Sequence, residues 1–290
     1  MPDGNSIINL GDLAKPATVL IEKISNAVGV LYEPRRIKRK AEAEAEAKKI
    51  KALAGIELSE IQQRGIERFV QQEARKQENI ESITAQAAHQ LPPDAQTDDL
   101  EEDWLSHFFD RCEKVSDKEM QSLWSRLLAG EATKPGTYSK RTVDFVASMD
   151  KKDAELFTRF CQFTWMVAGP VPLIFDNKDE IYKKNGIDFA ALKHLDSIGL
   201  ISFESVSGYR VTGQSKYSHV FYFGLPTLVE HENAQDNELK LGQALFTQAG
   251  RELVTVCGAQ RNQEFYEYAI RKLAEQGAIL SCLLPNQRVN

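Results

Sequence analysis

The feature that most constrains this chain is the stretch of residues 35–91, which contains no proline. It is rich in Ala, Glu, Lys, Gln and Arg, the residues that favour a helix most strongly. The stretch therefore predicts one long helix, roughly 85 Å in length if it is continuous. Its apolar stripe is thin, so the helix needs a partner, either copies of itself in a bundle or ring or the C-terminal part of its own chain. The stripe consists of Ile50, Ala54, Leu58, Ile61, Gly65, Phe69, Ile80, Ile83, Ala87 and Leu91.

An amphipathic segment, residues 17–31, precedes this helix. At about 22 Å it is shorter than a hydrocarbon core of roughly 30 Å, so it is not expected to cross a membrane as an ordinary helix. It could lie in a bilayer interface or pack against other protein. Ser25 and Gly29, four residues apart, would allow close contact between helices. The predicted membrane or oligomer face consists of Ala17, Leu20, Ile21, Ile24, Ala27, Val28 and Leu31.

A basic cluster follows directly after this segment. Residues 35–51 hold eight basic side chains against three acidic ones, whereas residues 98–120 hold nine acidic against three basic. An anionic partner should therefore meet the N-terminal end, where cations attract anionic lipid headgroups. The predicted contacts with anionic lipids of the inner membrane are Arg35, Arg36, Lys38, Arg39 and Lys40.

The composition excludes several classes of protein. With 290 residues, of which 42% are hydrophobic, the chain can form one large or two ordinary domains. A net charge of −6 argues against a protein that coats nucleic acid over its whole surface. The four cysteines are far apart and predict neither disulfides nor a zinc site. The N-terminus lacks a secretory signal, so we expect a cytoplasmic protein that is recruited to the inner membrane on activation.

The predicted fold is mainly α with a smaller α+β part. The expected parts are an amphipathic N-terminal segment (1–34), a helical stalk (35–92), a helical bundle (99–168) and a winged-helix-like α+β domain (169–290). The fourth bundle helix is expected over residues 153–167. Residues 92–99 resemble a linker because they contain two prolines and several Asp residues.

The winged-helix interpretation depends on the order of elements after residue 186. Asp188 is expected to cap a helix that ends near Gly199, followed by a strand (200–203), a hairpin through residues 209–211 and a strand over 219–223. The charged residues between Asp188 and Phe223 sum to zero, and the candidate recognition helix offers only Lys193 and His194. A DNA-reading helix normally brings several phosphate-binding cations. A structural or protein-binding role is therefore favoured.

The sequence contains no common catalytic motif. A P-loop and the G-x-G-x-x-G, G-x-S-x-G and H-E-x-x-H patterns are all missing, so we expect no enzyme, no catalytic residues, no metal and no cofactor. A weak nuclease-like set remains, and a solvated start of a helix explains it better. The set consists of Asp176, Asp179, Glu180, Lys183 and Lys184.

One run of sequence resembles a known family. The run from Glu119 to Glu131 (EMQSLWSRLLAGE), continued by residues 135–142 (PGTYSKRT), resembles a bacterial and prophage family that is known only as a domain of unknown function. Over this helical core the chain is also similar to abortive-infection alpha type proteins. The resemblance implies a prophage or defence setting and no catalytic residues.

Together these observations predict an antiphage defence protein. The C-terminal region would sense a phage-encoded or host protein, and the N-terminal helices would form a homo-oligomer that disrupts the inner membrane. One alternative is a prophage winged-helix regulator that binds DNA through Lys193 and Arg210. Another alternative is a non-enzymatic scaffold for protein interactions that is built on the long helix.

Overall fold

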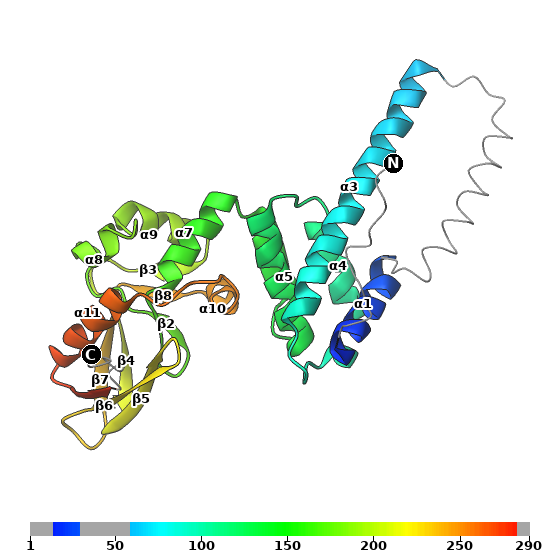
Figure 1. The fold of residues 1–290 in the computed structure, drawn as a ribbon. Helices are drawn as coiled ribbons and strands as arrows, with labels where there is room; N and C mark the ends of the chain where they lie inside the picture. Colours follow the sequence, from blue (N-terminus) through cyan, green and yellow to red (C-terminus); the bar gives the residue numbers. More distant parts are fainter. Residues whose placement is uncertain (1–13, 30–58, 283–290) are drawn as a thin grey trace, which may run out of the picture. The chain divides into compact units, whose positions relative to one another are not determined.

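The computed structural model describes residues 14–29 and 59–282 (Figure 1). These residues form a mixed α/β structure with more helix than strand. The chain divides into two compact units, residues 1–148 and 149–290. The sequence placed this boundary later, after residue 168. The difference arises because Phe157 and Phe160 pack edge-to-face on Phe246, which assigns their helix to the second unit.

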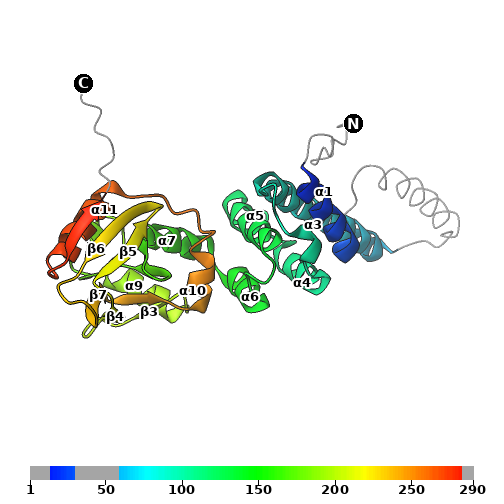
Figure 2. The ribbon, with the colours of Figure 1, turned by 90° about the horizontal axis from the view of Figure 1, so that it is seen from below.

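Unit 1 is helical (Figure 2), and buried aromatic side chains form part of its core. Phe108 lies at its centre, stacked on Trp104 with ring centroids 5.0 Å apart and edge-on to Trp124 at 5.1 Å. The described elements are α1 (Lys15–Val28), α3 (Glu60–Gln90), the 3₁₀ turn η2 (Thr97–Asp99), α4 (Glu102–Cys112), α5 (Lys118–Thr133) and α6 (Lys140–Ser148).

The long helix is shorter than expected. Helix α3 begins at Glu60, because the preceding Ser59 is extended, with φ −58° and ψ 151°. The Gln62 side chain accepts the Ser59 backbone N–H at 2.9 Å, as in a capping box. The helix predicted over residues 35–91 is therefore not continuous, and residues 35–58 lie outside the described residues.

The C-terminal half of α3 packs into unit 1 through both apolar and polar contacts. Ile80, Ile83 and Ala87 are buried. The buried Asn79 donates to the Glu113 carbonyl at 2.9 Å and accepts from the Gln121 amide at 3.0 Å. These bonds satisfy amides that would otherwise be costly to bury, and they fix how α3 packs against α5.

The described residues of unit 2 form three antiparallel sheets and five helices. The largest sheet has the order β2-β1-β5-β6-β9, and the other two are the pairs β3–β8 and β4–β7. The strands are β1 (Thr164–Met166), β2 (Pro170–Pro172), β3 (Ile201–Phe203), β4 (Tyr209–Gln214), β5 (Tyr217–Tyr222), β6 (Leu225–Glu230), β7 (Asn237–Gly242), β8 (Ala244–Phe246) and β9 (Ile279–Cys282). The helices are α7 (Lys151–Cys161), α8 (Glu180–Lys183), α9 (Phe189–Ser197), α10 (Gln248–Leu253) and α11 (Gln263–Ala274).

Helix α11 lies against the five-stranded sheet (Figure 2). Tyr266 stacks on Trp165 of β1, with ring centroids 5.7 Å apart and planes within 8° of each other. It also stacks on Tyr222 of β5 at 5.6 Å. All three rings are buried, so this stack joins α11 to the middle of the sheet.

Two local predictions differ from the structure. The helix expected over residues 153–167 ends at Cys161, and Thr164–Met166 form β1, because Trp165 is buried in the sheet. The winged-helix order is not confirmed. β3 pairs with β8 through Ile201 and Phe246, and β4 pairs with β7. These pairings join strands that are distant in sequence, so the expected hairpin does not form. The predicted cap is confirmed, since the Asp188 carboxylate accepts the Ala191 N–H at 2.8 Å.

Candidate functional site

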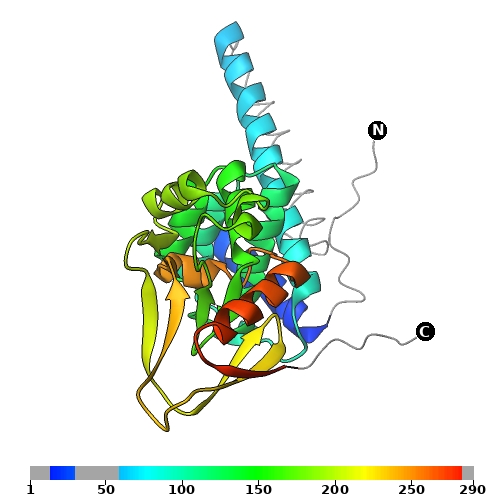
Figure 3. The ribbon, with the colours of Figure 1, turned by 90° about the vertical axis from the view of Figure 1, so that its left-hand side faces the viewer.

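An exposed apolar strip runs along the N-terminal half of α3. Every residue from Glu60 to Arg75 is exposed, and in Figures 1 and 3 this half of α3 extends beyond the other helices of unit 1. Four large side chains on it have exposed fractions between 51% and 71%. We define the α3 strip as Ile61, Gly65, Ile66, Phe69 and Val70.

The α3 strip continues the face that is buried further along the same helix. Each residue turns the helix by about 100°, so Ile66 and Phe69 lie on the same side of α3 as Ile80 and Ile83, which are farther along the helix. Glu60, Arg64 and Glu67 lie on the opposite side, whereas Glu73 lies on the same side as the α3 strip, at its C-terminal end. An apolar side of a helix that is left in water is the usual mark of a surface that binds another protein.

Unit 2 holds a pocket between α11 and the β4–β7 pair. Its volume is about 420 Å³. Three cations line it, Arg210 of β4, Lys240 of β7 and Lys272 of α11, together with the carboxylate of Glu275. We call this cavity the basic pocket. Phe175 and Tyr209 add aromatic rings to its wall.

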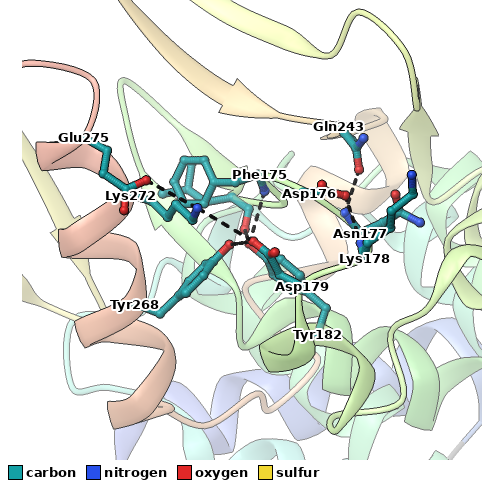
Figure 4. A network of polar contacts seen from close by, with 11 residues as sticks. Phe175, Asp176, Asn177, Lys178, Asp179, Tyr182, Gln243, Tyr268, Lys272 and Glu275 are labelled. Atoms are coloured by element: carbon teal, nitrogen blue, oxygen red, sulfur yellow. Dashed lines mark hydrogen bonds and ion pairs between the residues drawn. The ribbon is translucent and has the colours of Figure 1, made fainter.

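A network of polar contacts includes Phe175, Lys272 and Glu275 of the basic pocket (Figure 4). The Tyr268 hydroxyl donates to the Asp179 carboxylate at 2.5 Å, and the Lys272 ammonium lies 4.0 Å from the same carboxylate. Lys272 also pairs with Glu275 at 3.3 Å. The Tyr182 hydroxyl donates to the Leu173 carbonyl at 2.8 Å and accepts the Phe175 N–H at 3.1 Å. The network therefore holds Lys272 and the loop before α8 in place.

The two phenols of this network have raised pKa values. Burial raises the pKa of Tyr268 well above its usual range, and the neighbouring Tyr182 and Asp179 raise it further. Burial likewise raises the pKa of Tyr182. Both phenols stay protonated at neutral pH, so neither can act as a general base.

The apolar face predicted on α1 lies in the interior of unit 1. Leu20, Ile21 and Ile24 are completely buried. Ala17 and Ile21 form a cluster with Ala88, and Leu91 packs against it. Ser25, Ala27 and Val28 are half-buried, and Gly29 is exposed and ends the helix with φ +74°. Lipid contact through this face would require α1 to detach.

The rest of the predicted N-terminal site falls on residues that the structure does not describe. Leu31, Arg35, Arg36, Lys38, Arg39 and Lys40 lie outside the described residues. Among the helices that the structure describes, none is long and apolar enough to cross a membrane.

The cations required for DNA binding are already paired. Lys193 lies 2.7 Å from Asp196, and the His194 ring lies 2.6 Å from Asp153 of α7. Arg210 contacts both carboxylate oxygens of Glu238, at 3.1 and 3.2 Å. Phosphate binding would have to compete with these carboxylates, which weakens the DNA-binding alternative.

The nuclease-like set does not form one site. Asp179 is bonded to Tyr268, and Lys184 pairs with Glu264 of α11. Asp176 accepts the backbone N–H of Lys178 at 2.9 Å, as in a turn. Within residues 14–29 and 59–282, no group of three or more His, Cys, Asp and Glu side chains could hold a metal ion.

Sequence reasoning did not find the basic pocket, although it named Arg210. Lys240 and Lys272 lie 30 and 62 residues after Arg210, and no local spacing connects the three. They meet because β4 pairs with β7 and because Gln276, after α11, exchanges two hydrogen bonds with the Lys240 backbone, at 2.9 and 3.2 Å. The alternation of residues in β7 was the one available signal, since it places Lys240 on the exposed face.

The comparisons with known proteins give a family but no activity. A family model described as "Protein of unknown function (DUF2806)" matches residues 63–270. No curated protein and no solved structure matches the chain. The expectation of a family of unknown function is thereby confirmed, whereas the similarity to abortive-infection proteins stays a prediction.

Proposed function

Because the chain belongs to the DUF2806 family, whose function is unknown, we propose a function from its surface: a non-enzymatic interaction protein that self-associates through the α3 strip. The observation that carries this proposal is the exposure of four large apolar side chains on one side of a helix whose other half is buried. This is the scaffold alternative of the sequence analysis, with a defined surface.

Burial of the exposed half of α3 against a partner would lower its free energy. Complete burial of a Leu, Ile or Phe side chain is worth about 1.5–3 kcal/mol relative to exposure. The helix is also weak by itself, because a segment of about 16 residues is marginal in water and Gly65 costs about 1 kcal/mol relative to Ala. A partner that covers the α3 strip would supply both the missing burial and the missing support for the helix.

A second copy of α3 fits this surface. Gly65 has open space around it, with no atom within 4 Å of the position a Cβ would take. Two copies of α3 could pair antiparallel, with the two-fold axis near Glu67. The Phe69 ring of each copy would then lie in the space left by the missing side chain of Gly65 in the other copy. The uncharged amides of Gln62 and Gln72 flank the strip, so like charges do not oppose this two-fold pairing.

The expected dimer is weak. The exposed half of α3, about 16 residues, is about 24 Å long, and two such helices give an interface near the lower limit of roughly 1,000 Å² for specific contacts. We therefore expect a dimer that dissociates on dilution, unlike an obligate one.

Sedimentation velocity over a series of protein concentrations tests the proposal. We expect the wild-type sedimentation coefficient to rise with concentration, and the double variant Ile66→Ser with Phe69→Ser to stay monomeric. The matched control is Arg64→Ser with Glu67→Ser, which makes the same change on the opposite side of the helix and should dimerise like the wild type. A wild type that is monomeric throughout, or a control that behaves like the strip variant, would overturn the proposal in favour of another occupant.

The defence role and the membrane step remain predictions from the sequence and do not rest on the α3 strip. A phage-encoded or host trigger, binding to inner-membrane lipids and the lack of enzymatic activity all await a direct test. Self-association through α3 is compatible with the predicted homo-oligomer but does not depend on a membrane.

A further inference from the structure

The basic pocket is independent of the α3 strip and has the chemistry of a ligand site. Lys240 has no ion-pair partner among the described residues, although it lines the same cavity as Arg210 and Lys272. Lys240 is exposed at the edge of the pocket, and a lysine that no carboxylate of the described residues neutralises is available for an anion. Arg210, its cross-strand partner, and Lys272 line the same pocket, and both are paired with carboxylates.

The floor of the basic pocket is rigid. Gly242 adopts φ +105° and passes so close to Ile174 that an added Cβ would lie 2.1 Å from the Ile174 carbonyl oxygen. Gly208 adopts φ +62° and approaches the Gly242 carbonyl in the same way, at 2.9 Å from the position of a Cβ. Gln243, the next residue, donates its backbone N–H to Ile174 at 2.7 Å. Backbone segments packed this closely keep the cavity open without a ligand.

Of the three cations that line the pocket, two are paired with carboxylates, which leaves Lys240 for a phosphate. Glu238 holds the Arg210 guanidinium with two contacts, and Glu275 with Asp179 holds the Lys272 ammonium. A phosphate would compete with these carboxylates for Arg210 and Lys272, so Lys240 is the cation that can bind it first, with Arg210 beside it as its cross-strand partner. Clustered Lys and Arg side chains bind phosphate groups in proteins through charge attraction and charged hydrogen bonds.

The other residues that line the basic pocket could bind the aromatic ring and the hydroxyl groups of a ligand. The rings of Phe175 and Tyr209 line the cavity, and aromatic rings stack on the faces of nucleobases without regard to their sequence. The Glu275 carboxylate, which would repel a bare phosphate, can accept hydrogen bonds from sugar hydroxyls, as acidic residues do in nucleotide sites. A volume of about 420 Å³ lies within the usual range for small-molecule sites.

We infer that the basic pocket binds an aromatic phosphomonoester of the chemical class of mononucleotides, with its phosphate near Lys240 and Arg210 and its ring along Tyr209 and Phe175. No covalent step is involved.

Isothermal titration of the full chain with adenosine 5′-monophosphate tests this inference, with adenosine and inorganic phosphate as separate probes. We expect the mononucleotide to bind at least tenfold more tightly than either fragment, because only the complete ligand engages both the cations and the rings. Its affinity should fall as salt is added, because the cationic groups at the mouth of the pocket are exposed.

Two variants separate the site from nonspecific charge. Lys240→Met with Arg210→Met should weaken mononucleotide binding at least tenfold. The control Lys216→Met removes a lysine of the same unit that lies outside the pocket and pairs with Glu230, and it should bind like the wild type. Circular dichroism of all three proteins checks their folding. Absence of mononucleotide binding at about 1 mM, the limit of weak affinity, or an equal loss in the control would overturn the inference.

Discussion

The carboxylate of Glu131 accepts the backbone N–H of Tyr138 at 2.7 Å and that of Gly136 at 2.6 Å, and so closes the loop after α5. Glu131 is buried, and burial raises its pKa, while the backbone N–H groups lower it in part. The Tyr138 carbonyl in turn accepts the Trp104 indole N–H at 2.8 Å. The run of sequence that resembles a bacterial family therefore has a structural role here: it fixes a loop to the helical core.

Glu131→Gln should destabilise unit 1. The amide can accept only one of the two N–H groups and turns its own donor toward the other, which leaves buried donors without partners. We expect the free energy of unfolding to fall by about 1–3 kcal/mol in urea titrations. Glu78→Gln, on an exposed position of α3, is the control and should change it by less than about 0.5 kcal/mol. Equal stability of both variants would contradict the role given to Glu131.

Acid should weaken unit 2 through His231. Burial lowers the pKa of His231 below its ordinary value of 6.5, so the folded state binds a proton less readily than the unfolded state. This group therefore stabilises fully above about pH 6.5, and the contribution is lost as the pH falls from there through the lowered pKa. Thermal unfolding from pH 7.5 to 5 should show a steeper loss for the wild type than for His231→Gln. Parallel curves would show that His231 ionises freely when folded.

The sequence predicts those parts of the structure that are determined by residues close to one another in the chain. The Asp188 cap and the helices of unit 1 follow from neighbouring residues, and they were found. The start of α3 was missed because Ser59 sits among strong helix formers. The pairing of β3 with β8 and the meeting of Arg210, Lys240 and Lys272 depend on tertiary contacts that no local pattern encodes. The apolar face of α1 could be predicted from the sequence, but its binding partner could not, because such a face can pack against lipid or against protein.

Two glycines offer a matched test of the pocket floor. Gly242→Ala must adopt φ +105° and place a Cβ 2.1 Å from the Ile174 carbonyl oxygen, so we expect a loss of about 3 kcal/mol or more. Gly213→Ala also has a positive φ, +71°, but meets nothing within 4 Å and should cost only about 1–2 kcal/mol. Thermal unfolding compares the two. Similar losses would mean that the backbone at Gly242 can move away from Ile174.

The buried face of α1 changes how a membrane step must be tested. Ile24 is completely buried, so Ile24→Asp would place a charge in the core and destabilise unit 1 whether or not lipid is involved. A change that prevents α1 from leaving is more informative. Ala17 and Ala88 belong to one buried cluster, which makes the pair Ala17→Cys with Ala88→Cys a candidate lock between α1 and α3.

In the oxidised form this pair should hold α1 in unit 1, and in the reduced form it should release it. If the protein disrupts membranes through α1, dye release from liposomes of anionic lipid should be absent after oxidation and should return on reduction. The reduced protein is its own control, because its sequence and concentration are the same. Release by the oxidised form would show that lipid contact does not require α1 to detach. The absence of release from both forms and from the wild type would remove the membrane step and leave self-association through α3.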